Sequence, residues 1–368
     1  MDVAQQVQSL DRRTLTPLIR QALRRDDAEL VRWEYRAIPS LLGAAALSTV
    51  YRLSGTARVG GEAQPWSLIL KALTRPIAPV AGWDREVPAF RSGLLDDLPA
   101  GLAAPRCFAI EERPEAIWFW QEDVAEEGNA RWPVARFALA ARHLGRFSGP
   151  SLVAGPLPDA PWLSRATLQG RVDGNAAFWA GQLPVRDQTL LDRLFPADLL
   201  DRSRQVWEER HELLALLACL PQTLVHGDAD RRNLFARRGP DGAEETVAID
   251  WAWLGVAALG ADLVNLVAAS ALWFQADTDD LPALAEACVP AYGAGLADAG
   301  WSGDARLPRV GFAVATALRY GPCGPFAMIL QHPERARASG YVLADRMALV
   351  QRFAFDQLDA VRGDIAAL

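Results

Sequence analysis

The chain contains 368 residues, of which 51% are hydrophobic and 23% are charged, and this composition excludes a disordered or collagen-like protein. At roughly 100–200 residues per domain, the length predicts two domains or two lobes. The formal net charge of −7 and the pI of about 5.3 give no long-range field that would attract a phosphate backbone, so we expect no nucleic acid partner. Small cationic ligands are compatible with this charge.

The cysteines and the apolar segments indicate where the protein resides. The four cysteines lie far apart without a CxxC pair, so the sequence predicts neither a zinc site nor a disulfide framework, and a reducing cytoplasm fits best. The N-terminal MDVAQQVQSLDRR lacks the apolar stretch of a signal peptide. The most membrane-like segment, residues 251–274, contains Asp262 and Asn265, and ionisable groups at bilayer depth are costly. We therefore expect a cytoplasmic protein without a membrane partner.

The first third of the chain has the pattern of a sheet. Leucines and an isoleucine on one face predict a helix over residues 14–25. Lys71 is the sole lysine among 38 Lys and Arg residues, and strand alternation places it on the face opposite Trp66, where a ligand rather than the core can receive it. Apolar segments between turn-like connections predict three antiparallel strands. These strands are residues 30–38, 48–58 and 65–73.

The predicted secondary structure changes from strands to helices near residue 124. Asp84 is suited to cap a helix that contains Glu86, and residues 107–124 predict two short strands joined by a turn. Beyond them the pattern is mainly helical, with helices at 131–147 and about 203–220. We therefore divide the chain into an N-terminal lobe and a helical C-terminal lobe. Their residues are 1–123 and 124–368.

The most informative stretch is HGDADRRNLF followed by VAIDW. Strand-like residues 234–238 and 246–249 flank a turn, and a hairpin brings the far ends of its strands together, so Asn233 is expected beside Asp250. These two oxygen ligands, with the carboxylate of Asp228 five residues upstream, form a group suited to Mg²⁺. Phosphoryl transfer needs such a metal site, a lysine on the phosphates and one carboxylate for the attacking hydroxyl.

These motifs resemble the H-G-D-x-x-x-x-N and I-D-W signatures of the aminoglycoside phosphotransferase and choline kinase family, relatives of protein kinases. The resemblance implies an α+β, two-lobed protein-kinase-like fold with an antiparallel-sheet N-lobe and a mainly helical C-lobe. It implies that Asp228 is the catalytic base, Asn233 and Asp250 are magnesium ligands, and Lys71 binds the α- and β-phosphates of ATP with Glu86 as its partner.

The resemblance also implies roles for three other regions. The loop between the first two strands should cover the phosphates, and Gly43 is its only glycine, a departure from glycine-rich loops. The segment WFWQEDV resembles the hinge, where backbone groups around Trp120, Gln121 and Glu122 would bind adenine. Asp262 matches a family aspartate of structural type, which accounts for a carboxylate inside an apolar stretch.

Several residues have a simpler interpretation. We expect His226 to hold the catalytic loop by hydrogen bonds rather than to transfer protons. Glu86 could instead be a solvated acid in the first turn of a helix, and Asp230, Arg231 and Arg232 lie at variable motif positions where a solvated loop is the default. Aromatic residues after the metal aspartate could wall an acceptor pocket. These aromatic residues are Trp251, Trp253, Trp273 and Phe274.

The predicted activity is the transfer of the γ-phosphoryl group from ATP, with Mg²⁺, to a hydroxyl of a small molecule such as an aminoglycoside, a sugar, choline or another metabolite. The alternative is a nucleotide-binding pseudokinase with a regulatory role. A kinase acting on proteins is disfavoured because no segment after Asp250 resembles an activation loop. Asp277, Asp279 and Asp280 could meet a polycationic acceptor, although an acidic run is usually solvated surface.

Overall fold

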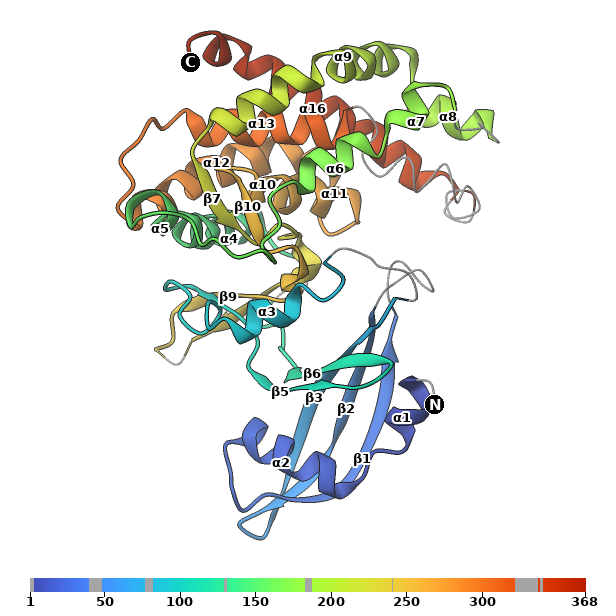
Figure 1. Cartoon of the computed structure of the whole chain (residues 1–368), viewed down its shortest axis with the longest axis vertical. Helices are drawn as coiled ribbons and strands as arrows, with labels where there is room; N and C mark the ends of the chain where they lie inside the picture. The colour runs from blue at the N-terminus through green and yellow to red at the C-terminus, as the bar shows by residue number, and fades with distance from the viewer. Residues whose placement is uncertain are drawn as a thin grey trace. The chain divides into compact units, whose positions relative to one another are not determined.

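The structure, a computed structural model, describes the chain except for short gaps (Figure 1). The chain divides into two compact units, of which unit 1 comprises residues 1–97 and 103–125, and unit 2 comprises residues 98–102 and 126–368. Unit 1 holds an antiparallel sheet and unit 2 is mainly helical, as the predicted α+β class requires. The described residues are 3–39, 48–76, 82–128, 131–182, 187–239, 241–321, 337 and 340–368.

Unit 1 is built on a five-stranded antiparallel sheet with the order β1-β2-β3-β6-β5. The three strands predicted before residue 75 are all present. The third begins three residues earlier than expected, because Gly60 and Gly61, with φ of 58° and 92°, form a two-residue turn that lets β2 and β3 pair up to it. The strands are β1 (Glu29–Ile38), β2 (Ser48–Val59), β3 (Glu62–Thr74), β5 (Cys107–Glu112) and β6 (Ala116–Glu122).

One face of this sheet carries the core of unit 1. Helices α1 (Val3–Gln8) and α2 (Arg12–Leu23) cover that face (Figure 1). The Asp11 carboxylate caps α2 by accepting from the Thr14 N–H at 2.9 Å, so this helix begins two residues before the predicted one. Its buried leucines and isoleucine pack against alternate residues of β3 and β6. The strand residues are Trp66, Leu68, Leu70, Ala72, Ala116, Trp118 and Trp120.

The opposite face of the sheet carries Lys71. Leu73, two residues further along β3, packs with Val87 and Phe119 in a second, smaller apolar cluster. Val87 belongs to α3 (Glu86–Arg91), so this short helix covers the face from which Lys71 projects. The predicted alternation along β3, with Trp66 and Lys71 on opposite faces, is confirmed by the two separate clusters.

Unit 2 combines helices with two small sheets (Figure 1). One sheet pairs β7 (Gln222–Val225) with β10 (Gly255–Ala258), and the other has the order β4-β9-β8. The latter strands are β4 (Leu102–Ala103), β8 (Leu234–Arg238) and β9 (Glu244–Ala248). The helices are α4 (Val134–Ser148), α5 (Pro150–Val153), α6 (Thr167–Asp173), α7 (Ala176–Trp179), α8 (Gln188–Leu194), α9 (Ala197–Cys219), α10 (Asp262–Val264), α11 (Ser270–Leu272), α12 (Leu281–Asp298), α13 (Leu307–Tyr320) and α16 (Val342–Ala366).

Residues 98–102 differ from the sequence-based division, which assigned them to the N-terminal lobe. They belong to unit 2 because their backbone bonds to it: the Thr246 N–H donates to Gly101 O at 2.8 Å, and Arg146 donates to Ala100 O at 3.0 Å. The chain crosses into unit 2 for the last time after Ala125, two residues after the predicted boundary.

Among the described residues, no helix is both long enough and apolar enough to cross a bilayer. The segment 251–274, the most membrane-like in sequence, is divided among several short elements instead of one long helix. These include β10, α10, α11 and a π-helical turn at Asn265–Ala269, and the polar residues Asn265 in this turn and Ser270 in α11 are buried. Single π-helical turns are frequent at functional sites.

Close packing of α4 on α12 gives a test of this fold. Gly295 is buried in α12, and a Cβ there would overlap the backbone carbonyl of Arg142 in α4. We predict that Gly295→Ala lowers the free energy of unfolding by about 1–3 kcal/mol through overpacking. The control is Gly293→Ala in the same helix, where a Cβ meets nothing within 4 Å and higher helix propensity should stabilise by about 0.5–1 kcal/mol. Urea denaturation measures the free energy of unfolding of both variants, and equal changes would contradict the close packing of α12 on α4 at Gly295.

Candidate active site

The hairpin predicted from the spacing of the motifs is present in unit 2. Strands β8 and β9 pair in antiparallel register from Leu234 opposite Ala248 outward. One residue beyond that pair, the Ile249 N–H donates to Asn233 O at 2.9 Å. Asn233 therefore lies opposite the residue that immediately precedes Asp250, as the hairpin geometry predicted.

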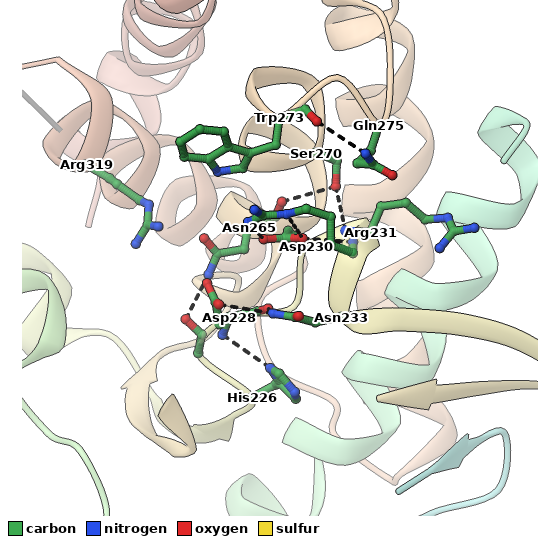
Figure 2. Close-up of polar contacts among 12 residues, drawn as sticks. His226, Asp228, Asp230, Arg231, Asn233, Asn265, Ser270, Trp273, Gln275 and Arg319 are labelled. Carbon is green, nitrogen blue, oxygen red and sulfur yellow. Dashed lines mark hydrogen bonds and ion pairs between the residues drawn. The ribbon is translucent and has the colours of Figure 1, made fainter. Parts of the chain in front are cut away.

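The side chain of Asn233 is oriented by Asp228 (Figure 2). Asn233 Nδ2 donates to Asp228 O at 2.9 Å and to Asp228 Oδ2 at 3.0 Å. Since both amide hydrogens have acceptors, the network assigns the Asn233 oxygen to the other side of the amide, where no donor within the described chain contacts it. An oxygen presented in this way is available to a cation.

Asp250 lies two residues beyond the end of β9, in an uncommon backbone conformation. Its φ of 61° lies in the left-handed region, where aspartate is more frequent than most residues. The residues that follow turn at once into the single-turn helix Trp251–Trp253, so the Asp250 carboxylate is carried by a sharp turn at the strand end. An amide oxygen and a carboxylate at adjacent strand ends suit Mg²⁺, which takes one or two protein carboxylates and fills its other positions with water and phosphate oxygens.

The surroundings of Asp228 raise the pKa of its carboxyl group above that of an exposed aspartate. Burial, followed by the negative charges of Asp230 and Asp250, raises the pKa of Asp228 to about 6. The positive charges of Arg319 and Arg171 act in the opposite direction. A carboxyl group with a pKa near the working pH is well suited to accept a proton.

His226 is fully buried and has a structural role. Its Nε2 lies 2.9 Å from Ile249 O, and its Nδ1 accepts from the Asp228 N–H at 3.2 Å. These two contacts require the neutral tautomer with hydrogen on Nε2, in agreement with burial, which lowers the pKa of His226. His226 thus joins the loop to the strand end that carries Asp250, which supports the structural interpretation of this histidine.

Asp262 fixes the backbone of the same loop from the other side. Its two carboxylate oxygens accept the N–H groups of His226 and Gly227, each at 2.8 Å. Asn265, one helical turn further, donates from Nδ2 to Gly227 O at 2.8 Å. The buried polar residues of the apolar segment therefore bind the backbone of the loop that contains Asp228, as the structural role proposed for Asp262 implies.

The sequence predicts a solvated loop at the variable motif positions 230–232, but the structure buries two of these three side chains. Asp230 is buried and accepts from the Arg232 guanidinium, with an Nη2 to Oδ2 distance of 2.5 Å, while Arg232 lies over the Trp273 ring. Arg231 is also buried, donates to Leu234 O at 2.7 Å and pairs with Glu126 at 3.0 Å. Their backbone positions are fixed as well, since the Arg231 N–H donates to the Ser270 hydroxyl (Figure 2).

In unit 1, the predicted partner of the only lysine is in place. Lys71 Nζ lies 2.5 Å from Glu86 Oε2, and both side chains are nearly buried. The structure thus supports the ion pair over a solvated glutamate. Because α3 begins at Glu86, the short helix positions this carboxylate over the Lys71 face of the sheet.

The predicted hinge residues lie at the end of β6, in the interior of the sheet. Trp120 is buried in the core and donates from Nε1 to Glu111, and the Glu122 N–H donates to Arg106 O at 2.9 Å. Gln121 is buried as well and pairs with β3 and β5. The next buried residue is Val124, whose N–H and C=O have no hydrogen-bond partner within the described chain. The predicted loop glycine, Gly43, lies outside the described residues.

A cavity of about 270 Å³ in unit 2 lies beside the loop that contains Asp228, with Gly227 in its wall. Of the four aromatic residues considered for an acceptor pocket, Trp253 lines this cavity, whereas Trp251 is core. The cavity is also lined by Arg171 and Arg319, which the sequence did not single out. No pattern could have found them, because arginine fills all but one of the chain's 38 basic positions.

The described residues contain no group of three or more His, Cys, Asp or Glu side chains able to hold a metal ion. The predicted ligand set is of another kind, since it has one amide and one carboxylate that would act together with phosphate oxygens. Asn233 and Asp250 fit such a site because the amide oxygen of Asn233 is turned away from its hydrogen-bonded neighbour.

Solved structures of small-molecule kinases share this fold. An aminoglycoside phosphotransferase from Alicyclobacillus acidocaldarius matches with a TM-score of 0.53 and 15% identity over 92% of this chain and 93% of its own. Choline kinase from Cryptosporidium parvum matches with a TM-score of 0.51 and 12% identity over 91% and 90%. A spectinomycin phosphotransferase, solved with ADP and spectinomycin, matches with a TM-score of 0.50 and 11% identity over 95% and 100%.

These similarities confirm the predicted α+β kinase-like fold and agree with the family resemblance of the two motifs. No family model matches the chain, and no curated protein matches it. The fold is therefore established by structure, and the chemistry is assigned from the site.

The two hydrogen bonds that Asp262 accepts from the loop backbone can be tested by measuring the free energy of unfolding. Asp262→Ala leaves the buried N–H groups of His226 and Gly227 without acceptors, so we expect the free energy of unfolding to fall by at least about 2 kcal/mol. Asp262→Asn keeps one acceptor oxygen and should lose less. The control is Asp201→Ala, an exposed carboxylate on α9, expected within about 0.5 kcal/mol of wild type. Chemical denaturation measures all three variants, and an unchanged free energy of unfolding for Asp262→Ala would contradict a stabilising role for these two hydrogen bonds.

Proposed function

We propose that the protein is an ATP- and magnesium-dependent phosphotransferase that moves the γ-phosphoryl group to a hydroxyl of a small molecule. The observation that carries this proposal is the bonding of Asn233 to Asp228 at the end of the hairpin that leads to Asp250. It joins a candidate base to one candidate metal ligand, and the hairpin places the second candidate ligand, Asp250, next to the residue opposite Asn233. The kinase-like fold shared with choline kinase and aminoglycoside phosphotransferase structures supports the assignment.

Asn233 and Asp250 would hold the magnesium ion. When bound, this ion would neutralise charge on the β- and γ-phosphates. Asn233 is suited to bind the ion because Asp228 fixes the plane of its amide group. Asp250 is suited to bind it because the next residue, Trp251, is buried and packs against the His226 ring, which holds the turn at Asp250 in place. Preorganised ligands avoid the entropic cost of ordering side chains during binding.

Asp228 would orient the acceptor hydroxyl and take its proton. One of its oxygens accepts from Asn233, and the other has no hydrogen-bond donor within the described chain, so it is available to the acceptor hydroxyl. The backbone of the loop cannot move away easily, since Asp262, Asn265 and His226 all bind it. General-base catalysis depends on this kind of fixed position.

Unit 1 would bind the rest of the nucleotide. Lys71 would contact the α- and β-phosphates, with Glu86 holding its ammonium group in position. The backbone N–H and C=O of Val124, rather than the paired groups of Trp120 and Glu122, are the best candidates for the adenine edge. Adenine recognition by backbone groups needs only one donor and one acceptor at a strand end.

We predict that Asp228→Asn separates binding from chemistry. Loss of the base should reduce kcat by about 100-fold or more, whereas the affinity for ATP with Mg²⁺ should stay within a few-fold because Asn233 and Asp250 are intact. Coupled ADP release measures the rate and calorimetry measures the affinity. The control is Asp279→Asn, the same change at an exposed position, expected to behave as wild type.

The outcome discriminates among roles. If Asp228→Asn lost nucleotide affinity with little further effect on rate, Asp228 would be a metal ligand and not the base. If wild type bound ATP with Mg²⁺ but never turned it over, with acceptors or with water, the chain would be a nucleotide-binding module without catalysis.

A second prediction uses the only lysine. A lysine-directed ATP analogue should modify Lys71, and the modified peptide is identified by mass spectrometry. Excess ATP with Mg²⁺ should prevent the reaction. Lys71→Arg should lose phosphoryl transfer despite its retained charge, because the planar guanidinium cannot replace a compact ammonium beside Glu86. Labelling that ATP does not reduce would contradict the assignment of Lys71.

A further inference from the structure

The cavity beside the catalytic loop has a distinct chemical character. It lies within unit 2, where α6, α9, α13 and β10 contribute to its wall. Gly227 lines it, and the next residue, Asp228, is close enough for its charge to interact with that of Arg171 in the cavity wall. Its volume of about 270 Å³ lies near the lower end of the ~300–1,000 Å³ typical of ligand pockets, which suits a small metabolite.

Arg171 enters this cavity from α6. Its guanidinium lies over the Trp253 ring, with 5.0 Å from Cζ to the ring centroid. No carboxylate and no hydrogen-bond acceptor of the described chain contacts this guanidinium. Burial, followed by the charge of Arg319, lowers the pKa of Arg171 to about 10, although the group remains cationic at neutral pH.

Arg319 enters the same cavity from α13. Its only hydrogen bond within the described residues runs from Nε to the Tyr320 hydroxyl at 3.3 Å, and none reaches a carboxylate. In Figure 2 its guanidinium points toward Asn265 of the π-helical turn and toward the side of the loop that carries Asp228. Two unpaired guanidinium groups thus share one cavity.

Several other arginines of unit 2 are paired with carboxylates. Arg142 and Arg146 both pair with Asp298, and Arg202 pairs with two aspartates of α16. In the cavity, the lining carboxylate, Asp262, is already committed to two backbone N–H groups. Within the described chain no carboxylate contacts either guanidinium, and Asp228 interacts with both charges only at longer range.

We propose that the acceptor is a small anion that carries a hydroxyl group, with its carboxylate or phosphate bound by Arg171 and Arg319 and its hydroxyl directed to Asp228. This inference rests on the proposed function. Guanidinium groups bind carboxylate and phosphate through paired hydrogen bonds, and an anion would relieve the repulsion between the two arginines.

The same charges disfavour a cationic acceptor. Two adjacent guanidinium groups would repel choline or an aminoglycoside, and burial strengthens that repulsion. The acidic residues that could have attracted a polycation lie elsewhere, because Asp277 and Asp280 are exposed or half-exposed, pair with Arg131 and do not line the cavity.

The test compares acceptors that differ in charge. ADP release is measured with glycerate, gluconate and glucose 6-phosphate, with their neutral counterparts glycerol and glucose, and with choline and spectinomycin. Calorimetry measures the binding of the same compounds to the full chain loaded with a nonhydrolysable ATP analogue and Mg²⁺. We expect at least one anion to bind and react about tenfold better than its neutral counterpart. The carboxylate and phosphate members of the panel distinguish the two anionic groups.

Variants assign the effect to the two arginines. Arg171→Gln and Arg319→Gln should each raise KM for the anion about tenfold or more and remove its advantage over the neutral compound. Arg171→Lys and Arg319→Lys, which keep the charge, should recover part of it. The matched control is Arg204→Gln, an exposed arginine on α9, with the wild-type preference retained. Circular dichroism and unchanged ATP affinity confirm that each variant is folded.

The outcomes separate the two proposals. Failure to bind ATP with Mg²⁺ would overturn the phosphotransferase itself. Normal ATP binding, together with a preference for choline, spectinomycin or the neutral sugars, would overturn only the anionic acceptor. The absence of both binding and turnover with every anion tested would also overturn it, as would an anion preference that persists in the Arg171→Gln and Arg319→Gln variants.

Discussion

The candidate active site depends on one carboxylate that performs no chemistry. Asp262 accepts the N–H groups of His226 and Gly227, and this pair of bonds fixes the direction in which the chain leaves β7. Gly227 must adopt a φ of 80° there, with the Trp253 backbone in the space that a Cβ would fill. Everything that follows, including the position of Asp228, depends on this bend. The cost of burying Asp262 is offset by the backbone groups that it satisfies.

Sequence spacing was sufficient for the features that depend on local geometry. A hairpin brings Asn233 opposite Ile249, the residue before Asp250, and strand alternation places Lys71 and Trp66 on opposite faces. The assignment of residues 98–102 to unit 2 was not predictable, because it follows from long-range hydrogen bonds to Thr246 and Arg146 rather than from composition.

The arginines show a different limit of sequence reasoning. Lys71 was conspicuous because it is the only lysine, whereas Arg171 and Arg319 are two among 37 arginines. What distinguishes them is that both line one cavity beside Gly227 and that no carboxylate of the described chain contacts either guanidinium, a combination that only tertiary structure reveals. In the loop itself, Arg231 and Arg232 follow the opposite rule: each is paired with an acid, and both act as supports of the fold.

An anionic acceptor makes a demand on the site that a cationic one does not. It must approach a nucleotide triphosphate, and two unit charges roughly 6 Å apart repel by about 3 kcal/mol at an effective dielectric constant near 20. Binding the anion at Arg171 and Arg319 would offset this repulsion at the acceptor, while Lys71 and the metal ligands would offset it at the phosphates. The positive charge of the cavity would then contribute to catalysis as well as to selection, since it lets two anions meet at the Asp228 carboxylate.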